Sequence, residues 1–232
     1  MSDSLQVVSV NACRSLGSVS ALKSLVSGIS ESYPSWGVVA IQECDGMHVS
    51  ESELLDSCTS CMEPHIMYRH YGGVGNTSLA FIVNSKFKHV VKKLKTTSRC
   101  MSMLIRHKNA RPIQLVNVHG QEDPDETIQE VHEHVHAMRV NTDRRIIVGD
   151  FNIDLSATYP SFPFRGRIET EECEYARNML EQYAHHLSLQ VCTCTHIDGA
   201  VPYVCPLVSA APDILLQDLH LDFFLLCSTP VC

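Results

Sequence analysis

The sequence feature that most constrains the fold is an apolar run that leads directly into a polar segment. Residues 146–148 read Ile-Ile-Val, and residues 149–152 read Gly-Asp-Phe-Asn. The branched apolar residues predict a buried strand, and Gly149 predicts a sharp turn at its end. There a carboxylate such as Asp150 can orient or deprotonate a water, and an amide such as Asn152 can stabilise a charged oxygen. An ordinary strand-to-turn junction, where Asp and Asn are common, is the alternative.

Apolar patterning divides the rest of the chain into strands and helices. Strands are predicted at residues 5–10, 38–41, 79–83, 100–107, 112–118, 146–148, 191–195 and 219–226. Helices are predicted at residues 18–29, 125–140 and 169–187. Some strands alternate with helices and others follow each other directly. The pattern therefore predicts an α/β or α+β fold with mixed sheets rather than a purely parallel sheet.

The amino-acid composition limits the classes of protein to which the chain can belong. The chain is 44% hydrophobic and 19% charged, which fits a globular core. It has no apolar run of about 18 residues and no basic, apolar leader, so we expect an intracellular protein, nuclear or cytoplasmic, that does not enter a membrane. Eleven cysteines, an odd number, predict reduced thiols rather than a disulfide framework. The net charge of −8 argues against binding nucleic acid by bulk positive charge, although a metal ion could bridge the protein to a phosphate.

Four of the predicted strands end in polar residues that suit metal or phosphate chemistry. The first strand ends at Asn11 and the second at Glu43. The fifth ends at His119, and the sixth at Asp150 and Asn152. A rigid sheet can present such strand-end residues together at one rim, so we expect them to form a site.

This series of strand ends resembles the endonuclease/exonuclease/phosphatase superfamily, and within it the AP endonucleases and LINE-type retrotransposon endonucleases. The matching segments are residues 9–11, 40–43, 117–119, 148–152, 194–196 and 221–226. Because they span almost the whole chain, the resemblance implies a single domain over residues 1–232. It implies a four-layer αββα sandwich of two mixed sheets, and a phosphodiesterase that requires Mg²⁺ or Mn²⁺. Nucleic acid would be the partner, with DNA favoured over RNA; no oligomeric state is implied.

The resemblance also implies a role for each matching residue. Glu43 would be the metal ligand, and Asn11 would support the metal or the phosphate. His119 would lie near the phosphate, and Asp150 would orient or activate the attacking water. Asn152 would donate a hydrogen bond to the phosphoryl oxygen as negative charge develops there.

Two further matches lie near the end of the chain. Thr195 would place a hydroxyl near the substrate, and Asp222 matches the family's aspartate that orients a catalytic histidine. The family's Ser-Asp-His motif, which supplies that histidine, does not follow Asp222. We therefore expect a C-terminally truncated sandwich without its final strand, and impaired activity. Two alternatives stay open: a catalytically inactive remnant or binding module of the same fold, and a phosphatase of a small or lipid phosphoester.

Two charged or polar clusters fall outside these motifs. His132 and His136 lie one turn apart on the helix predicted at residues 125–140. They could form a chelating pair, but a solvated helix face is the simpler interpretation. The basic run at residues 86–95 is interpreted as a solvated strand or turn face.

Overall fold

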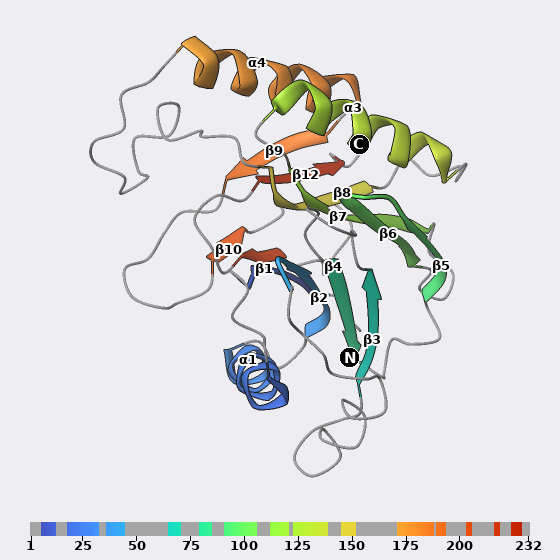
Figure 1. Cartoon of the computed structure of the whole chain (residues 1–232), viewed down its shortest axis with the longest axis vertical. Coiled ribbons are helices and arrows are strands. Elements are labelled where there is room, and N and C mark those ends of the chain that lie inside the picture. Colours follow the sequence, from blue (N-terminus) through green and yellow to red (C-terminus); the bar gives the residue numbers. More distant parts are fainter. Residues whose placement is uncertain are drawn as a thin grey trace.

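The computed structural model shows two β-sheets packed face to face, with helices on both outer sides (Figure 1). It describes residues 6–12, 18–32, 36–44, 65–70, 79–84, 91–105, 112–120, 123–138, 145–151, 171–187, 189–193, 203–205, 216–218 and 224–228. The predicted fold class, an α+β sandwich of two mixed sheets, is confirmed. Among the described helices, none combines the length and the apolar character that crossing a bilayer requires.

Sheet A is built around two parallel strands, β1 and β2. Its strand order is β10-β11-β1-β2-β4-β3. The strands are β1 (Gln6–Asn11), β2 (Trp36–Gln42), β3 (His65–His70), β4 (Leu79–Asn84), β10 (Tyr203–Cys205) and β11 (Leu216–Asp218). β1 pairs in parallel with β2 and β11, whereas the β2–β4, β3–β4 and β10–β11 pairs are antiparallel. The carboxyl ends of β1 and β2 therefore lie at the same edge of the sheet.

Sheet B also has a central parallel pair, β7 and β8. Its strand order is β5-β6-β7-β8-β12-β9. The strands are β5 (Val91–Thr96), β6 (Cys100–Ile105), β7 (Ile113–His119), β8 (Arg145–Asp150), β9 (Leu189–Thr193) and β12 (Phe224–Ser228). The other pairs in this sheet are antiparallel. As in sheet A, the carboxyl ends of the two parallel strands therefore lie at the same edge of the sheet.

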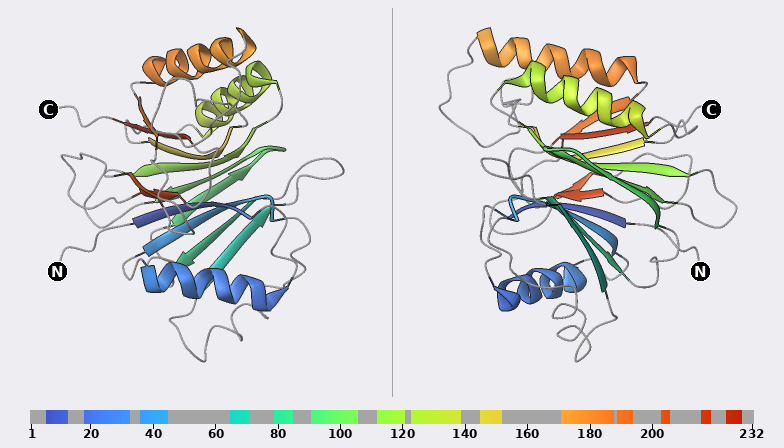
Figure 2. Two further views of the ribbon diagram at one scale, coloured as in Figure 1. Left: turned by 90° about the vertical axis from the view of Figure 1, so that its left-hand side faces the viewer. Right: turned by 45° about the vertical axis from the view of Figure 1, so that its right-hand side comes forward.

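Helices cover the outer face of each sheet, which completes four layers (Figure 2). α1 (Val19–Ser32) covers sheet A, and α3 (Pro124–Ala137) and α4 (Glu171–His186) cover sheet B. Successive strand residues point to opposite faces, so a strand buried on both sides is apolar throughout. In β2, for example, Val38 packs between the sheets and Val39 packs against the α1 side.

The start of α3 follows the sequence signals for a helix N-terminus. Asp123 caps the helix, and its Oδ1 accepts hydrogen bonds from the backbone N–H groups of Asp125 at 2.9 Å and Glu126 at 3.3 Å. Pro124 occupies the first turn, where its missing N–H leaves no hydrogen bond unmade. The helix predicted at residues 125–140 thus begins one residue earlier, at Pro124, and ends at Ala137.

Four short or charged strands were not predicted as separate elements. β10 and β11 are three residues long, too short for a periodic signal. β3 begins and ends with a histidine and also carries an arginine. The basic run at 86–95 partly forms β5, an edge strand of sheet B, and its residues 86–90 lie outside the described residues. Lysines on an edge strand discourage pairing with another chain, which agrees with the solvated-strand interpretation.

Candidate metal site at the joint of the two sheets

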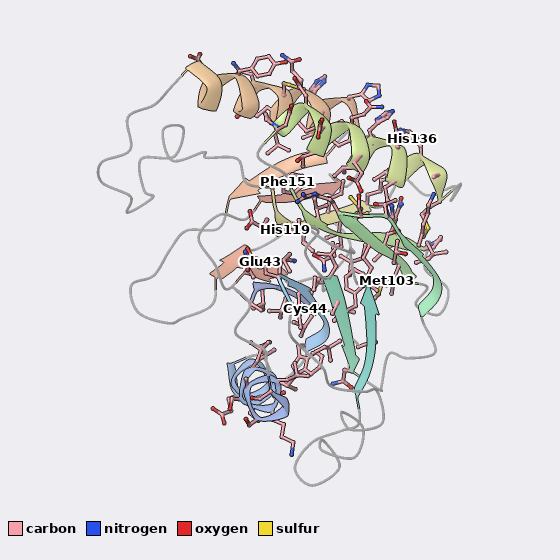
Figure 3. All side chains as sticks on the ribbon, in the orientation of Figure 1. Glu43, Cys44, Met103, His119, His136 and Phe151 are labelled. Atoms are coloured by element: carbon pink, nitrogen blue, oxygen red, sulfur yellow. The ribbon has the colours of Figure 1, made fainter. Side chains whose placement is uncertain are left out.

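The carboxyl ends of the two central strand pairs meet at one rim of the sandwich. In sheet A, the parallel register places Asn11 of β1 beside Gln42 of β2. In sheet B, it places His119 of β7 beside Asp150 of β8. Figure 3 shows Glu43 and His119 approaching each other from the two sheets. The strand ends that the sequence singled out are therefore neighbours in space.

Strand periodicity explains why His119 and Asp150 face the same space. Ile146 and Val148 of β8 point into the apolar layer between the sheets, and Asp150 continues that face two residues later. Leu115 of β7 points into the same layer, and His119 is again in phase with it. The apolar layer between the sheets thus ends in polar residues at this rim.

Glu43 reaches the cluster through an unusual backbone conformation. In β2, Val38 and Ala40 face the space between the sheets, so an extended backbone would turn residue 43 outward. The φ angle of Glu43 is 49°, in the left-handed region that residues other than glycine seldom adopt. Its side chain instead contacts Asn11 and His119. Backbone outliers of this kind concentrate at functional sites.

Four side chains form a compact cluster at the rim. The ligand atoms of Glu43, His119 and Asp150 all lie within 4.8 Å of one another. Asn11 Nδ2 donates hydrogen bonds to Glu43 Oε1 at 3.1 Å and to Asp150 Oδ2 at 2.8 Å. His119 Nε2 lies 3.3 Å from Glu43 Oε1. Asn11, His119 and Asp150 are buried whereas the Glu43 side chain is 23% exposed, so the cluster meets solvent at Glu43.

The donor set of this cluster fits a divalent metal ion. Two carboxylates held this close repel each other unless hydrogen-bond donors or a cation lie between them. Carboxylate oxygens are the ligands that Mg²⁺ and Mn²⁺ prefer, and both ions keep several waters when few protein ligands are present. Glu43 and Asp150 would supply the oxygens, and His119 would supply a nitrogen.

Comparison with known proteins finds matches among solved structures alone. No protein family and no curated protein sequence matches the chain. The endonuclease domain of TRAS1, a telomere-specific non-LTR retrotransposon, superposes with a TM-score of 0.55 and 16% identity over 96% of this chain and 84% of that one. The AP endonuclease LMAP from Leishmania major gives a TM-score of 0.56 and 12% identity over 94% and 77%. The 3′-5′ exonuclease NExo from Neisseria meningitidis gives 0.52 and 14% over 96% and 86%.

The chain has the endonuclease/exonuclease/phosphatase fold. The resemblance inferred from the sequence motifs is confirmed at this level. Identities of 12% to 16% establish a shared fold and no shared activity. The roles of individual residues therefore rest on the geometry of the rim cluster.

Two glycines allow β7 and β8, the strands that carry His119 and Asp150, to approach each other closely. Gly149 has a φ of +139°, and a Cβ atom there would lie 2.0 Å from the Val118 carbonyl oxygen. A Cβ atom on Gly120 would lie 2.3 Å from the Phe151 carbonyl oxygen. The sequence interpretation of Gly149 as a turn after the strand is wrong, because Gly149 lies within β8 and Asp150 is the last residue of that strand. The glycine is needed for close contact with β7.

A buried amide pair lies in the strands directly behind the cluster. Asn117 of β7 donates through Nδ2 to the backbone oxygens of Ile41 at 2.9 Å and Ala80 at 3.2 Å, which lie in the other sheet. Gln42 Nε2 donates to Asn117 Oδ1 and, at 3.2 Å, to Ser9 Oγ. These residues were not predicted as part of the site. They lie within the matching segments 9–11, 40–43 and 117–119, but no role was assigned to them.

A turn between β5 and β6 braces the backbone around His119. The backbone N–H of His119 donates to the Arg99 carbonyl oxygen at 3.0 Å, and Arg99 Nη1 donates to the Gly120 carbonyl oxygen at 3.0 Å. Glu130 of α3 fixes this turn, because its Oε1 accepts from Thr97 Oγ1 at 2.6 Å and from the Arg99 N–H at 3.0 Å. The position of His119 is thus tied to the outer helical layer.

The remaining predicted site residues are not placed by the structure. Asn152, Thr195 and Asp222 lie outside the described residues. Their roles at the phosphate, at the substrate and behind a catalytic histidine stay predictions.

Proposed function

We propose that this protein is a metal-dependent phosphodiesterase of the endonuclease type, which hydrolyses phosphodiester bonds of nucleic acid with Mg²⁺ or Mn²⁺. One observation carries the proposal: the ligand atoms of Glu43, His119 and Asp150 lie within 4.8 Å of one another at the rim where the two sheets meet. The fold supports it, because the similar structures include an endonuclease domain and an AP endonuclease.

Each residue of the cluster has a role that its position allows. Glu43 and Asp150 would hold the metal ion, which when bound would polarise a phosphoryl oxygen and offset the charge that develops there. Asn11 donates to both carboxylates, so it would keep them in place. Asp150 would orient the attacking water and accept its proton. His119 would supply a nitrogen as the third ligand of the metal ion.

DNA is the proposed substrate, in preference to RNA. The support comes from the similar structures, since TRAS1 is named as a telomere-specific retrotransposon and a structure of NExo is named as bound to a product DNA hairpin. The net charge of −8 makes the metal ion, rather than bulk positive charge, the expected bridge to the phosphate.

The same charge favours a second candidate function, a phosphatase that acts on a small phosphoester. A small substrate presents fewer charges to an acidic surface than a polynucleotide does. NExo, which has the same fold, is named both as a 3′ phosphatase and as a 3′-5′ exonuclease. The third candidate is an inactive remnant or binding module of the same fold.

The test is hydrolysis by the full chain in Mg²⁺ and in Mn²⁺ of three substrates: supercoiled plasmid, a 3′-phosphorylated oligonucleotide and a small chromogenic diester. We expect plasmid cleavage that Asp150→Ala and Glu43→Gln each reduce by roughly 100-fold or more. Glu31→Gln, which removes an exposed carboxylate on α1, is the matched control and should cleave like wild type. Release of phosphate from the 3′-phosphorylated oligonucleotide without cleavage of either diester would support the phosphatase, and no hydrolysis by a folded chain would support the remnant.

A further inference from the structure

Three histidines from two helices gather on the outer layer of the sandwich. His132 and His136 lie one turn apart on α3, and His186 is the last residue of α4. The ring centroids of His132 and His136 are 4.3 Å apart, and those of His132 and His186 are 6.1 Å apart. Figure 3 labels His136 on this outer layer, on the other side of sheet B from Glu43.

Packing against a tyrosine orients the middle ring of the three. The ring of Tyr183 on α4 meets the His132 ring edge-on, with centroids 5.7 Å apart. Tyr183 is buried and His132 is half-buried, whereas His136 and His186 are exposed. His132 therefore contacts aromatic rings of both helices. A solvated helix face does not by itself explain a third histidine brought in from a different helix.

The distances between the rings can be compared with those around a bound metal ion. With Zn–N bonds of about 2.0–2.1 Å, three imidazoles around a tetrahedral ion have ring centroids roughly 5 Å apart. The observed values of 4.3 Å and 6.1 Å lie on either side of that figure, so an ion shared by all three rings requires their side chains to rotate.

We propose that His132, His136 and His186 form a binding site for a divalent transition metal ion, Zn²⁺ in the first instance, that links α3 to α4. Imidazole ligands favour Zn²⁺, Ni²⁺ and Cu²⁺ over Mg²⁺, which prefers oxygen. Three protein ligands leave one position for water. The site is separate from the cluster at Glu43 and does not rest on the proposed hydrolase activity.

The test is a zinc titration of the chelator-treated full chain against a competing metal indicator, in excess Mg²⁺. We expect one zinc ion per chain whose affinity falls at least tenfold in His136→Ala and in His186→Ala. His185→Ala is the control: it removes an exposed histidine of the same helix that lines a hollow with Asn178, Glu181 and Gln182, and it should keep wild-type affinity. Zinc should raise the melting temperature of wild type and His185→Ala, and leave that of His186→Ala unchanged.

Two outcomes would overturn the proposal. The first is equal zinc affinity in wild type and His186→Ala, which would mean that no ion bridges the two helices. The second comes from the same titration with Co²⁺: a sulfur-to-metal charge-transfer band would assign the ion to cysteine thiolates instead. Circular dichroism of each variant confirms folding, and the two exposed positions leave the apolar core intact.

Discussion

At the residue scale, backbone contact at Gly149 sets the distance between the strands that carry His119 and Asp150. Gly149→Ala would place a Cβ atom 2.0 Å from the Val118 carbonyl oxygen, at a φ of +139° that alanine rarely adopts. We expect a loss of about 3 kcal/mol or more in the free energy of unfolding, measured by urea denaturation.

The control for this prediction is Gly28→Ala. Gly28 lies inside α1, and a Cβ atom there would meet nothing within 4 Å. Alanine is the better helix former, so this variant should be more stable than wild type by up to about 1 kcal/mol. Equal stability of Gly149→Ala and wild type would contradict the close approach of β7 and β8.

The sequence allows the individual site residues to be predicted, but not their arrangement in space. Asn11, Glu43, His119 and Asp150 could be singled out because each is a polar residue at the end of an apolar strand. That they meet could not be derived from local patterning, because Asn11 and Asp150 lie 139 residues apart and belong to different sheets. The positive φ of Glu43, which turns its side chain into the cluster, also has no local sequence signal.

At the element scale, the packing of α3 on sheet B buries His134. The free energy of unfolding therefore depends on pH. Burial lowers the pKa of His134 from 6.5 to about 4, with Lys95 adding to the effect and Glu130 opposing it. Its Nε2 lies 2.8 Å from Ser102 Oγ, and its buried Nδ1 has no hydrogen-bond partner among the described residues. Protonating this ring inside the fold would therefore bury an uncompensated charge.

The sign of the pH effect follows from that lowered pKa. The unfolded chain binds a proton near pH 6.5 and the folded chain only near pH 4, so the contribution is complete above pH 6.5 and lost as the pH falls towards 4. We expect the free energy of unfolding to fall by about 2 kcal/mol from this group between pH 7.5 and pH 5. His134→Gln should lack this part of the slope in urea denaturation. Parallel pH profiles for the two proteins would count against the buried neutral ring.

Prediction of the elements succeeded where a segment is long and periodic. α1, α3, α4 and the central strands carry an apolar period that matches their observed bounds to within a few residues. Three-residue strands carry too few side chains to show a period, and the pairing of β10 with β11 depends on the tertiary fold. Residues 219–226 were predicted as a strand, and β12 is observed at Phe224–Ser228, with residues 219–223 outside the described residues.

At the scale of the whole molecule, Asn117 connects the two sheets just behind the cluster. Its Nδ2 donates to backbone oxygens of Ile41 and Ala80 in sheet A, while Gln42 donates to its Oδ1. Asn117→Leu would leave these buried groups without their partner, so we expect a loss of about 2–4 kcal/mol in the free energy of unfolding.

A double-mutant cycle isolates this connection. Asn117→Leu leaves the Gln42 side-chain donor without its acceptor, and Gln42→Leu removes that donor. The double variant should therefore lose less stability than the sum of the losses in the two single variants. Strict additivity of the two losses would show that the amides act independently and would contradict the bridge.

The central claim is that Glu43, His119 and Asp150 together hold a divalent metal ion. The most direct measurement is Mn²⁺ binding to the full chain by electron paramagnetic resonance, compared among wild type, Glu43→Gln and the α1 control Glu31→Gln. Mn²⁺ distinguishes this cluster from the proposed histidine site on α3 and α4, because imidazole ligands bind Mn²⁺ more weakly than they bind Zn²⁺. We predict one bound Mn²⁺ in wild type and Glu31→Gln, with affinity reduced at least tenfold in Glu43→Gln. Equal Mn²⁺ affinity in all three proteins would contradict the claim.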